Sequence, residues 1–280
     1  MATCHNDRLF RNNFRAHTNA SVLSMLLLVA DIVQLLNEFI WPLVRISAFL
    51  QAGPFFSLTG LNLRIRVSLI LILTWLMFPL IDIPDINPFS FGAVGGIFHE
   101  VLVGGLMGLT LQVVIAALVV AGQAIAGSMG LSMANMIDPN LGNVPSLSQF
   151  FLIIGTLLFL ALGGHLIMLS VLFSSFQLIP IASGAFSADM IVAFLTWSSE
   201  IFIGAVVIAF PILIGLLLVN VMLGLVSRAA PSLNVFAIGF PALIPLGLGM
   251  LLLTMAIWFE QVENLWFVGF NTLNDIIGGS

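Results

Sequence analysis

Long apolar runs, separated by short polar or Pro/Gly segments, dominate the chain from residue 39 onward. A strand in lipid leaves backbone donors and acceptors unpaired at its edges, whereas a helix pairs them within the segment. The pattern therefore predicts an all-α protein with six apolar helical segments. These segments are Phe39 to Leu58, Val67 to Ile81, Gly92 to Ala126, Phe150 to Ile181, Met190 to Val226 and Leu233 to Phe259.

The lengths of the runs do not match six simple membrane spans. A helix of about 20 residues crosses a hydrocarbon layer of about 30 Å. At 1.5 Å per residue, the second run would cover only about 22 Å, and the third and fifth would reach about 52 and 56 Å if straight. We therefore expect bent, broken or partly spanning helices. Pro211 is expected to divide the fifth run, and Pro241 with Pro245 to kink the sixth, because proline lacks a backbone donor and clashes with the preceding turn.

The composition identifies the class of protein. The 280 residues are 60% hydrophobic and only 7% charged, whereas soluble domains carry about 25% charged residues. The net charge of −5 leaves no basic surface for nucleic acid. The chain is therefore predicted to be a polytopic membrane protein that contacts lipid and binds no nucleic acid.

The first 24 residues differ in composition from the rest and include Arg8, Arg11 and Arg15. One interpretation is an extension upstream of a true start at Met25. The others are a signal-peptide-like start with a weak cleavage site after Ala30, or a soluble cytoplasmic tail. Residues 25 to 280 are interpreted as a single membrane domain.

The residues give little support for an enzyme. His99 and Glu100 begin an H-E-x-x-H zinc motif, but Val103 occupies the position of the second histidine. The single cysteine, Cys4, excludes a cysteine-based metal cage. We expect no catalytic residue, no metal and no cofactor.

Four ionisable residues lie in or beside apolar sequence, where a charge at the bilayer centre costs at least about 2.5 to 3.5 kcal/mol and is usually functional. They are Arg45, Glu100, Asp138 and Glu200. One interpretation makes them members of a proton pathway. In the other, Arg45 extends to the membrane interface, Glu100 and Glu200 lie near helix ends, and Asp138 turns the chain before Pro139. The second is favoured for Arg45 and Glu200, and Glu100 stays undecided.

Small residues in the third run form two G-x-x-x-G patterns, Gly92 with Gly96 and Gly104 with Gly108. Such patterns allow helix backbones to approach closely in lipid. The contact is expected either within the chain or between subunits, and the sequence does not distinguish the two.

The segment from about residue 127 to 146 interrupts the apolar sequence with glycines and prolines. Met129, Met133 and Met136 are spaced i, i+4 and i+7, which places them on one face of a short helix. Flexible thioether side chains make a conformable apolar contact. Irregular backbone at membrane depth must be shielded by protein or line a cavity. The segment is thus either a plug or constriction, or an interfacial loop with a core-filling methionine stripe.

Five segments follow one another along the chain: FIWPLVRISAFLQAGPFF from Phe39, Glu100 through GLMGLTLQ, AGQAIAGSMGLSMANMIDP from Ala121, GGHLIMLSVLFSSFQLIPI from Gly163 and LVNVMLGLVSRAAPSLNVFAIGFP from Leu218. Together these segments resemble the FliR family of flagellar biosynthetic proteins, whose virulence-associated counterparts serve type III secretion. They occur in the family's order and cover nearly all of the chain from Phe39. The block Gly164, His165, Leu166, Ser175, Phe176 and Pro180 favours the flagellar branch.

The resemblance implies an export-gate subunit in the flagellar basal body that assembles with FliP and FliQ beside FlhB and FlhA. Such gates pass unfolded flagellar subunits across the inner membrane, and family members wind with their partners into a helical cone. The resemblance also implies that a loop from about Gly127 to Pro139 is the plug that closes the channel. Its candidate residues are Gly127, Met129, Gly130, Met133, Met136, Asp138 and Pro139. Other members often carry phenylalanine where Met133 and Met136 stand.

Three other functions remain open on the sequence alone. A proton-coupled transporter of a small solute would use Glu100 or Asp138 as the proton carrier. A virulence-type gate would share the architecture but export other cargo. A scaffold without a pore-lining role would support assembly only.

Overall fold

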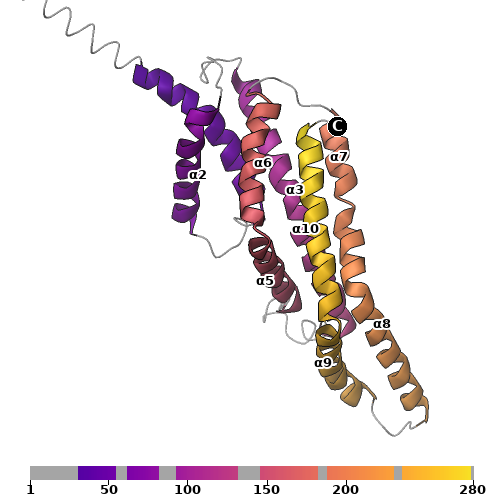
Figure 1. Cartoon of the computed structure of the whole chain (residues 1–280). Coiled ribbons are helices and arrows are strands. Elements are labelled where there is room, and N and C mark those ends of the chain that lie inside the picture. Colours follow the sequence, from indigo (N-terminus) through magenta and orange to yellow (C-terminus); the bar gives the residue numbers. More distant parts are fainter. Residues whose placement is uncertain are drawn as a thin grey trace, which may run out of the picture.

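The computed structural model describes residues 31–54, 62–81, 93–131, 146–181, 188–229 and 235–278, and every regular element within these ranges is helical. The predicted all-α membrane fold is confirmed. In Figure 1 the N-terminal helix and α2 lie at one side of the molecule and α8 at the other, with α3, α6 and α10 between them. Residues 1–30, which include the possible Met25 start, lie outside the described part.

The first two helices form the edge of the bundle. The N-terminal helix runs from Asp31 to Ala52, before Gly53 and Pro54, and α2 covers Leu63–Met77 with a short 3-10 turn at Phe78–Leu80. Asn62 caps α2 by accepting a hydrogen bond from the Arg64 backbone amide at 3.3 Å, so the helix starts before the predicted run. Phe39 packs against the rings of Trp75 and Phe78, with ring centroids 6.4 and 5.8 Å away.

The central helix, α3, covers Ala93–Ser128 and packs most extensively against α8 and α5. Its 36 residues correspond to about 54 Å of helix, which is longer than a hydrocarbon layer of about 30 Å. Its buried residues extend along nearly its whole length, from Ala93 to Ile125, although Val94 and Phe98 near its start are each 63% exposed. The core of the protein is built around α3.

The fourth run is broken into two helices, α5 (Ser146–Ala161) and α6 (Gly164–Leu178), which are bent by 69°. Gly163 lies between them with φ of 68°, a left-handed conformation that costs glycine nothing. The bend agrees with the expectation that some runs are broken.

The fifth run is also interrupted, but not at the predicted residue. Helix α7 covers Ala188–Trp197 and α8 covers Glu200–Ala229, and α8 continues through Pro211. The prediction that Pro211 divides the run is wrong. The interruption falls at Ser198 and Ser199, whose hydroxyls donate to the carbonyls of Phe194 and Thr196, each at 2.8 Å. Such local bonds compete with the helical ladder, whereas the neighbours of Pro211, Ala209 and Ile212, are buried in the core.

The sixth run bends after its prolines. Helix α9 covers Val235–Leu253 and contains Pro241 and Pro245, and a 65° bend at Thr254 separates it from α10, Met255–Gly278. Helix α10 extends far beyond Phe259, where the apolar run was expected to end. Its aromatic residues pack on α5, with ring centroids 5.1 Å apart for Phe151 and Trp258 and 4.8 Å apart for Phe159 and Trp266.

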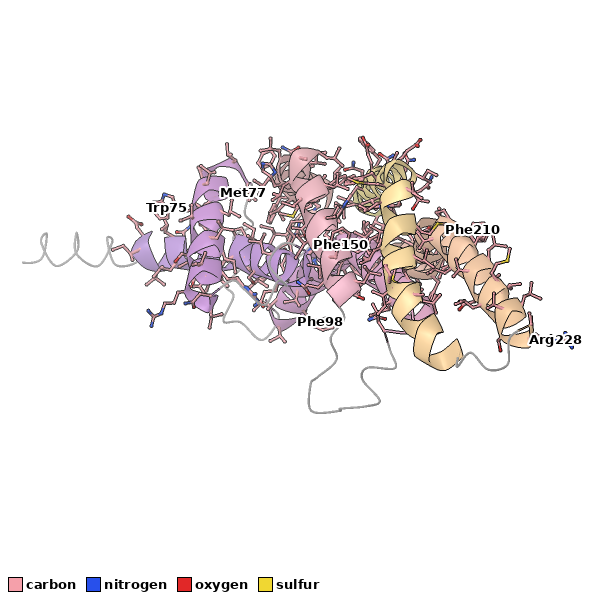
Figure 2. The ribbon with its side chains drawn as sticks, turned by 90° about the horizontal axis from the view of Figure 1, so that it is seen from below. Trp75, Met77, Phe98, Phe150, Phe210 and Arg228 are labelled. Carbon is pink, nitrogen blue, oxygen red and sulfur yellow. The ribbon has the colours of Figure 1, made fainter. Side chains whose placement is uncertain are left out.

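Four described helices are long and apolar enough to cross a membrane, and the two bent pairs raise this number to six if each pair forms one span. Large apolar side chains cover much of the outer surface of α2 and α8. Trp75 and Phe210, near opposite ends of the molecule in Figure 2, are 72% and 56% exposed. These outer faces suit lipid or partner helices better than water.

Candidate functional site

The end of α3 carries the first residues of the candidate plug. Gly130 has φ of 79°, its backbone amide donates to the Gly127 carbonyl at 3.0 Å, and the Leu131 amide donates to the Ala126 carbonyl at 3.1 Å. This pair of hydrogen bonds around a left-handed glycine is a Schellman motif, which ends a helix and reverses the chain. Gly130 therefore makes the turn, and Gly127 lies in the last turn of the helix.

Met129 lies immediately before this turn and is only 1% exposed. Its side chain covers Gly247 of α9: a Cβ atom at residue 247 would lie 2.7 Å from the Met129 Cγ and 2.9 Å from its Sδ. Met129 also lines an apolar pocket of about 470 Å³ between α3, α5 and α9, together with Leu131, Leu147, Phe150, Ile244, Leu248, Leu251 and Leu252. The packed contact between Met129 and Gly247 therefore lies directly before the remaining residues of the candidate plug. The other candidate residues, Met133, Met136, Asp138 and Pro139, lie outside the described residues.

Arg45 and Glu100 form an ion pair between the N-terminal helix and α3. The Arg45 Nε lies 2.6 Å from Glu100 Oε2, and its Nη2 lies 3.0 Å from Oε1, so the guanidinium binds both carboxylate oxygens. Both side chains are completely buried. The His99 Nδ1 lies 3.3 Å from Glu100 Oε1 and completes the cluster.

Arg45 also holds the end of α6. Its Nη1 donates to the carbonyls of Ser175 and Ile179 at 3.0 and 2.9 Å, and its guanidinium carbon lies 4.5 Å from the centre of the Phe176 ring. The Ser175 carbonyl also accepts the backbone amide of Ile179 at 2.9 Å, and a cation at the C-terminal end of a helix is favoured by the helix dipole. Pro180 follows directly and prevents the helix from continuing. A single side chain therefore joins three helices.

The interpretation that Arg45 extends to the membrane interface is wrong, because its side chain has no exposed surface. A buried carboxylate and two carbonyls satisfy the guanidinium inside the protein, so it has no need of water. Glu100 is the eighth residue of α3 and is equally buried, whereas Glu200 is the first residue of α8.

The second G-x-x-x-G pattern packs within the chain. A Cβ atom at Gly108 would lie 2.6 Å from the Phe49 carbonyl oxygen and 2.8 Å from the Gly53 amide nitrogen. At Gly104 it would meet the Arg45 carbonyl oxygen and lie 3.1 Å from the Phe49 amide. Both glycines therefore bring α3 against the backbone of the N-terminal helix, beside the ion pair. Of the first pattern, Gly96 is half-buried in α3 and Gly92 lies outside the described residues.

Helix α10 is the element that the sequence prediction missed. Polar residues such as Glu260 and Glu263 interrupt its apolar sequence, so it does not form a continuous run. The sequence does indicate this helix through its periodicity, because the residues that are buried recur every three or four positions. They are Trp258, Val262, Leu265, Trp266, Gly269, Phe270, Leu273, Ile276 and Ile277.

The exposed side of α10 forms part of a second pocket, of about 170 Å³, against α8. Glu200, Gln261 and Asn264 supply its polar groups, and apolar residues such as Val207 and Leu265 supply the walls. Among the described residues, no group of three or more His, Cys, Asp or Glu side chains is arranged to hold a metal ion.

Long apolar helices and two sharply bent helix pairs, packed around a buried central helix, define a polytopic all-α membrane protein. Residues 36–268 match the family described as "Bacterial export proteins, family 1", and the chain belongs to this family. The resemblance to FliR expected from the sequence is thereby confirmed.

Similar proteins named "Flagellar biosynthetic protein FliR" occur in several bacteria. The protein from Escherichia coli (strain K12) is 33% identical over 243 residues, which cover 86% of this chain and 93% of that protein. The protein from Pectobacterium carotovorum subsp. carotovorum is 33% identical, with 88% and 95% covered. The protein from Bacillus subtilis (strain 168) is 32% identical, with 88% and 97% covered.

Proposed function

We propose that this chain is a subunit of the flagellar protein export apparatus, embedded in the bacterial inner membrane at the flagellar basal body. The observation that carries the proposal is the match to FliR proteins along most of both sequences. In this proposal the chain has no enzymatic activity. It forms, with FliP and FliQ and beside FlhB and FlhA, a channel for unfolded flagellar subunits.

The arrangement of the helices is compatible with such an assembly. Helices α2 and α8 expose extended apolar faces, and the bent pairs do not form straight spans. A monomeric protein with these features would leave bent helices poorly matched to a flat bilayer. Partner helices that cover part of these faces would remove the mismatch.

The channel is proposed to be closed by the segment that follows α3. Apolar constrictions block ions because water leaves a narrow apolar passage. Met129, Gly130 and the residues up to Pro139 would form the closure, which begins at the turn made by Gly130. Because Met129 is buried, the proposal places it at the base of the closure rather than at its tip.

The transporter alternative is weakened by the ion pair. A proton carrier must exchange protons with water, and Glu100 is fully buried and bound by two nitrogens of the Arg45 guanidinium. Asp138, the other proposed carrier, lies outside the described residues.

Two experiments test the proposal. Deletion of the gene should abolish flagellar filaments, and an affinity-tagged chain that restores them should co-purify with FliP and FliQ. A chain that purifies alone and whose loss leaves filaments intact would contradict the gate function.

The closure is tested separately. Replacing Met129, Met133 and Met136 together by glycine should make cells leak ions while leaving assembly intact. Unchanged permeability in an assembled gate would favour the scaffold function instead.

A further inference from the structure

Helix α2 exposes apolar side chains on nearly all of its sides. Of its 15 residues, only Ile70, Thr74 and Met77 are buried. The large apolar side chains that it exposes include Leu63, Ile65, Leu71, Ile72, Trp75 and Leu76. One neighbouring helix covers only one side of another helix, whereas a helix that is apolar all round suits surroundings that are apolar all round.

The few polar groups within α2 are already satisfied by its own backbone. The hydroxyls of Ser68 and Thr74 donate to the carbonyls of Arg64 and Ile70 at 2.8 and 2.7 Å. Residues 67 to 80 carry no charge. With the short 3-10 turn the helical segment has 18 residues, about 27 Å of helix, which is close to a hydrocarbon layer of about 30 Å. No side chain in this stretch therefore needs water.

The composition of α2 favours lipid over a partner helix. Helices that pack closely in membranes do so through small residues, as α3 does at Gly104 and Gly108. Helix α2 contains neither glycine nor alanine. Its exposed side chains are large and branched, so they fit mobile acyl chains better than the close contact of a second helix.

The positive charges of α2 are confined to its beginning. Arg64 is exposed and Arg66 is half-buried. Among the described residues neither guanidinium forms an ion pair, and the Arg66 Nε has no hydrogen-bond partner. The carboxylate of Glu38 belongs to the other end of the helix pair, because the adjacent Phe39 packs on Trp75, about 17 Å along α2 from Arg64. Two uncompensated guanidiniums at the end of an apolar helix suit the phosphate groups of a membrane surface.

We propose that α2 is a lipid-facing span and that Arg64 and Arg66 bind the phosphates of anionic phospholipids in the leaflet where the helix begins. Residues two apart lie on different sides of a helix, so each arginine would contact its own lipid. An arginine near an anionic surface strengthens binding by about fivefold. The inference concerns the chain in a membrane and does not depend on the proposed export function.

The chain carries its own reporter for this contact. Trp75 is 72% exposed, whereas the other four tryptophans, Trp41, Trp197, Trp258 and Trp266, are buried. Bromine atoms on lipid acyl chains quench the fluorescence of tryptophans that they touch. In nanodiscs of brominated phosphatidylcholine, the wild-type chain should be strongly quenched, and the Trp75→Phe chain should lose only a small fraction of its fluorescence. Equal fractional quenching of the two chains would overturn the inference.

The same comparison on the chain purified together with its partner proteins separates lipid from a covering helix. The part of the fluorescence that Trp75→Phe removes should remain quenched by the brominated lipid. Loss of this quenching in the complex would mean that a partner covers α2, and the lipid-facing span would be refuted. If the chain binds no partner, the export proposal fails, and the measurement on the chain alone still decides the lipid contact.

The headgroup preference is tested in nanodiscs with equal amounts of phosphatidylglycerol and phosphatidylcholine, of which only one carries bromine. Brominated phosphatidylglycerol should quench the wild-type chain more than brominated phosphatidylcholine does. The preference should be lost in Arg64→Gln/Arg66→Gln and kept in Arg64→Lys/Arg66→Lys, which retains both charges.

Arg228→Gln is the matched control, because Arg228 is exposed at the opposite end of the molecule from Trp75 (Figure 2). This variant should keep the preference for phosphatidylglycerol. Equal quenching of the wild-type chain by the two lipids would refute the phosphate contact, and so would a preference that survives Arg64→Gln/Arg66→Gln.

Discussion

The guanidinium of Arg45 and the carboxylate of Glu100, 55 residues apart in sequence, bind each other through two hydrogen bonds of 2.6 and 3.0 Å inside the bundle. Neither side chain has exposed surface. Because Arg45 also donates to the carbonyls of Ser175 and Ile179, the pair fixes the end of α6 relative to the N-terminal helix and α3. The two charges neutralise each other where each alone would be costly.

Replacing only Arg45 should lower the stability of the protein more than replacing Arg45 and Glu100 together. Arg45→Met leaves the Glu100 carboxylate buried without its cation, which costs about 3–5 kcal/mol. The double variant Arg45→Met/Glu100→Leu removes both charges. It leaves the α6 carbonyls without the Arg45 donor and the His99 Nδ1 without the Glu100 carboxylate, and an unsatisfied buried group costs about 1–3 kcal/mol. Thermal unfolding of the purified chain in detergent should therefore rank wild type above the double variant, and the double variant above Arg45→Met.

The charge-reversed pair Arg45→Glu/Glu100→Arg provides the control. It restores opposite charges but places the cation on α3, away from the α6 carbonyls that Arg45 reaches. It should be more stable than Arg45→Met and less stable than wild type. If Arg45→Met were as stable as the double variant, the two charges would not compensate each other.

Gly108 should not tolerate a side chain, whereas Gly105, three residues earlier in α3, should tolerate one. A Cβ atom at Gly108 would lie 2.6 Å from a backbone oxygen that cannot move away, but nothing lies within 4 Å at Gly105. Overpacking of this kind costs about 1–3 kcal/mol. Gly108→Ala should lower the melting temperature, and Gly105→Ala should leave it unchanged or raise it, because alanine favours the helix. Equal melting temperatures would contradict the close approach of α3 to the N-terminal helix.

The positions of the helices were largely predictable from the sequence, because a continuous apolar run in lipid has to be helical. The breaks were less predictable. Three prolines were expected to divide or kink the helices, yet the two sharp bends fall at Gly163 and at Thr254, and the short interruption between α7 and α8 falls at Ser198 and Ser199. A proline in a packed helix removes one hydrogen bond, and the packing of the surrounding turns keeps the helix continuous. Hydroxyl side chains that bond to the local backbone can interrupt a helix without a strong sequence signal.

The candidate site was predictable only in part. The sequence identified Arg45 and Glu100 as unusual charges, but their pairing depends on which faces of two distant helices meet. It also identified Met129, but the contact with Gly247, far along the chain, appears only when α9 folds back on α3. Helix α10 was missed because a helix that is apolar on one side only does not form a continuous apolar run.

The bend between α5 and α6 should depend on the left-handed backbone of Gly163. No neighbour obstructs a Cβ atom there, so Gly163→Ala tests the backbone conformation alone. A non-glycine residue in this conformation costs about 1–2 kcal/mol. Gly163→Asn should cost less, because asparagine tolerates this region better. The melting temperature should be highest for the wild type, lower for Gly163→Asn and lowest for Gly163→Ala. Identical values for all three would contradict the left-handed backbone conformation of Gly163.

The outer face of α10 should be accessible to water, in contrast to the outer face of α8. Glu263 and Asn264 are exposed on α10 within one turn of Glu260, and burying several such groups in hydrocarbon is costly. Phe210 on α8 is also exposed, but its neighbours are apolar and suit lipid. In a Cys4→Ser background, a membrane-impermeant maleimide should label Asn264→Cys in open membrane fragments and should not label Phe210→Cys, because only a thiol in water ionises and reacts. Val262→Cys, which replaces a side chain that is 1% exposed on the inner face of the same helix, should also stay unlabelled. Labelling of Phe210→Cys but not of Asn264→Cys would mean that α10 faces lipid and α8 faces water.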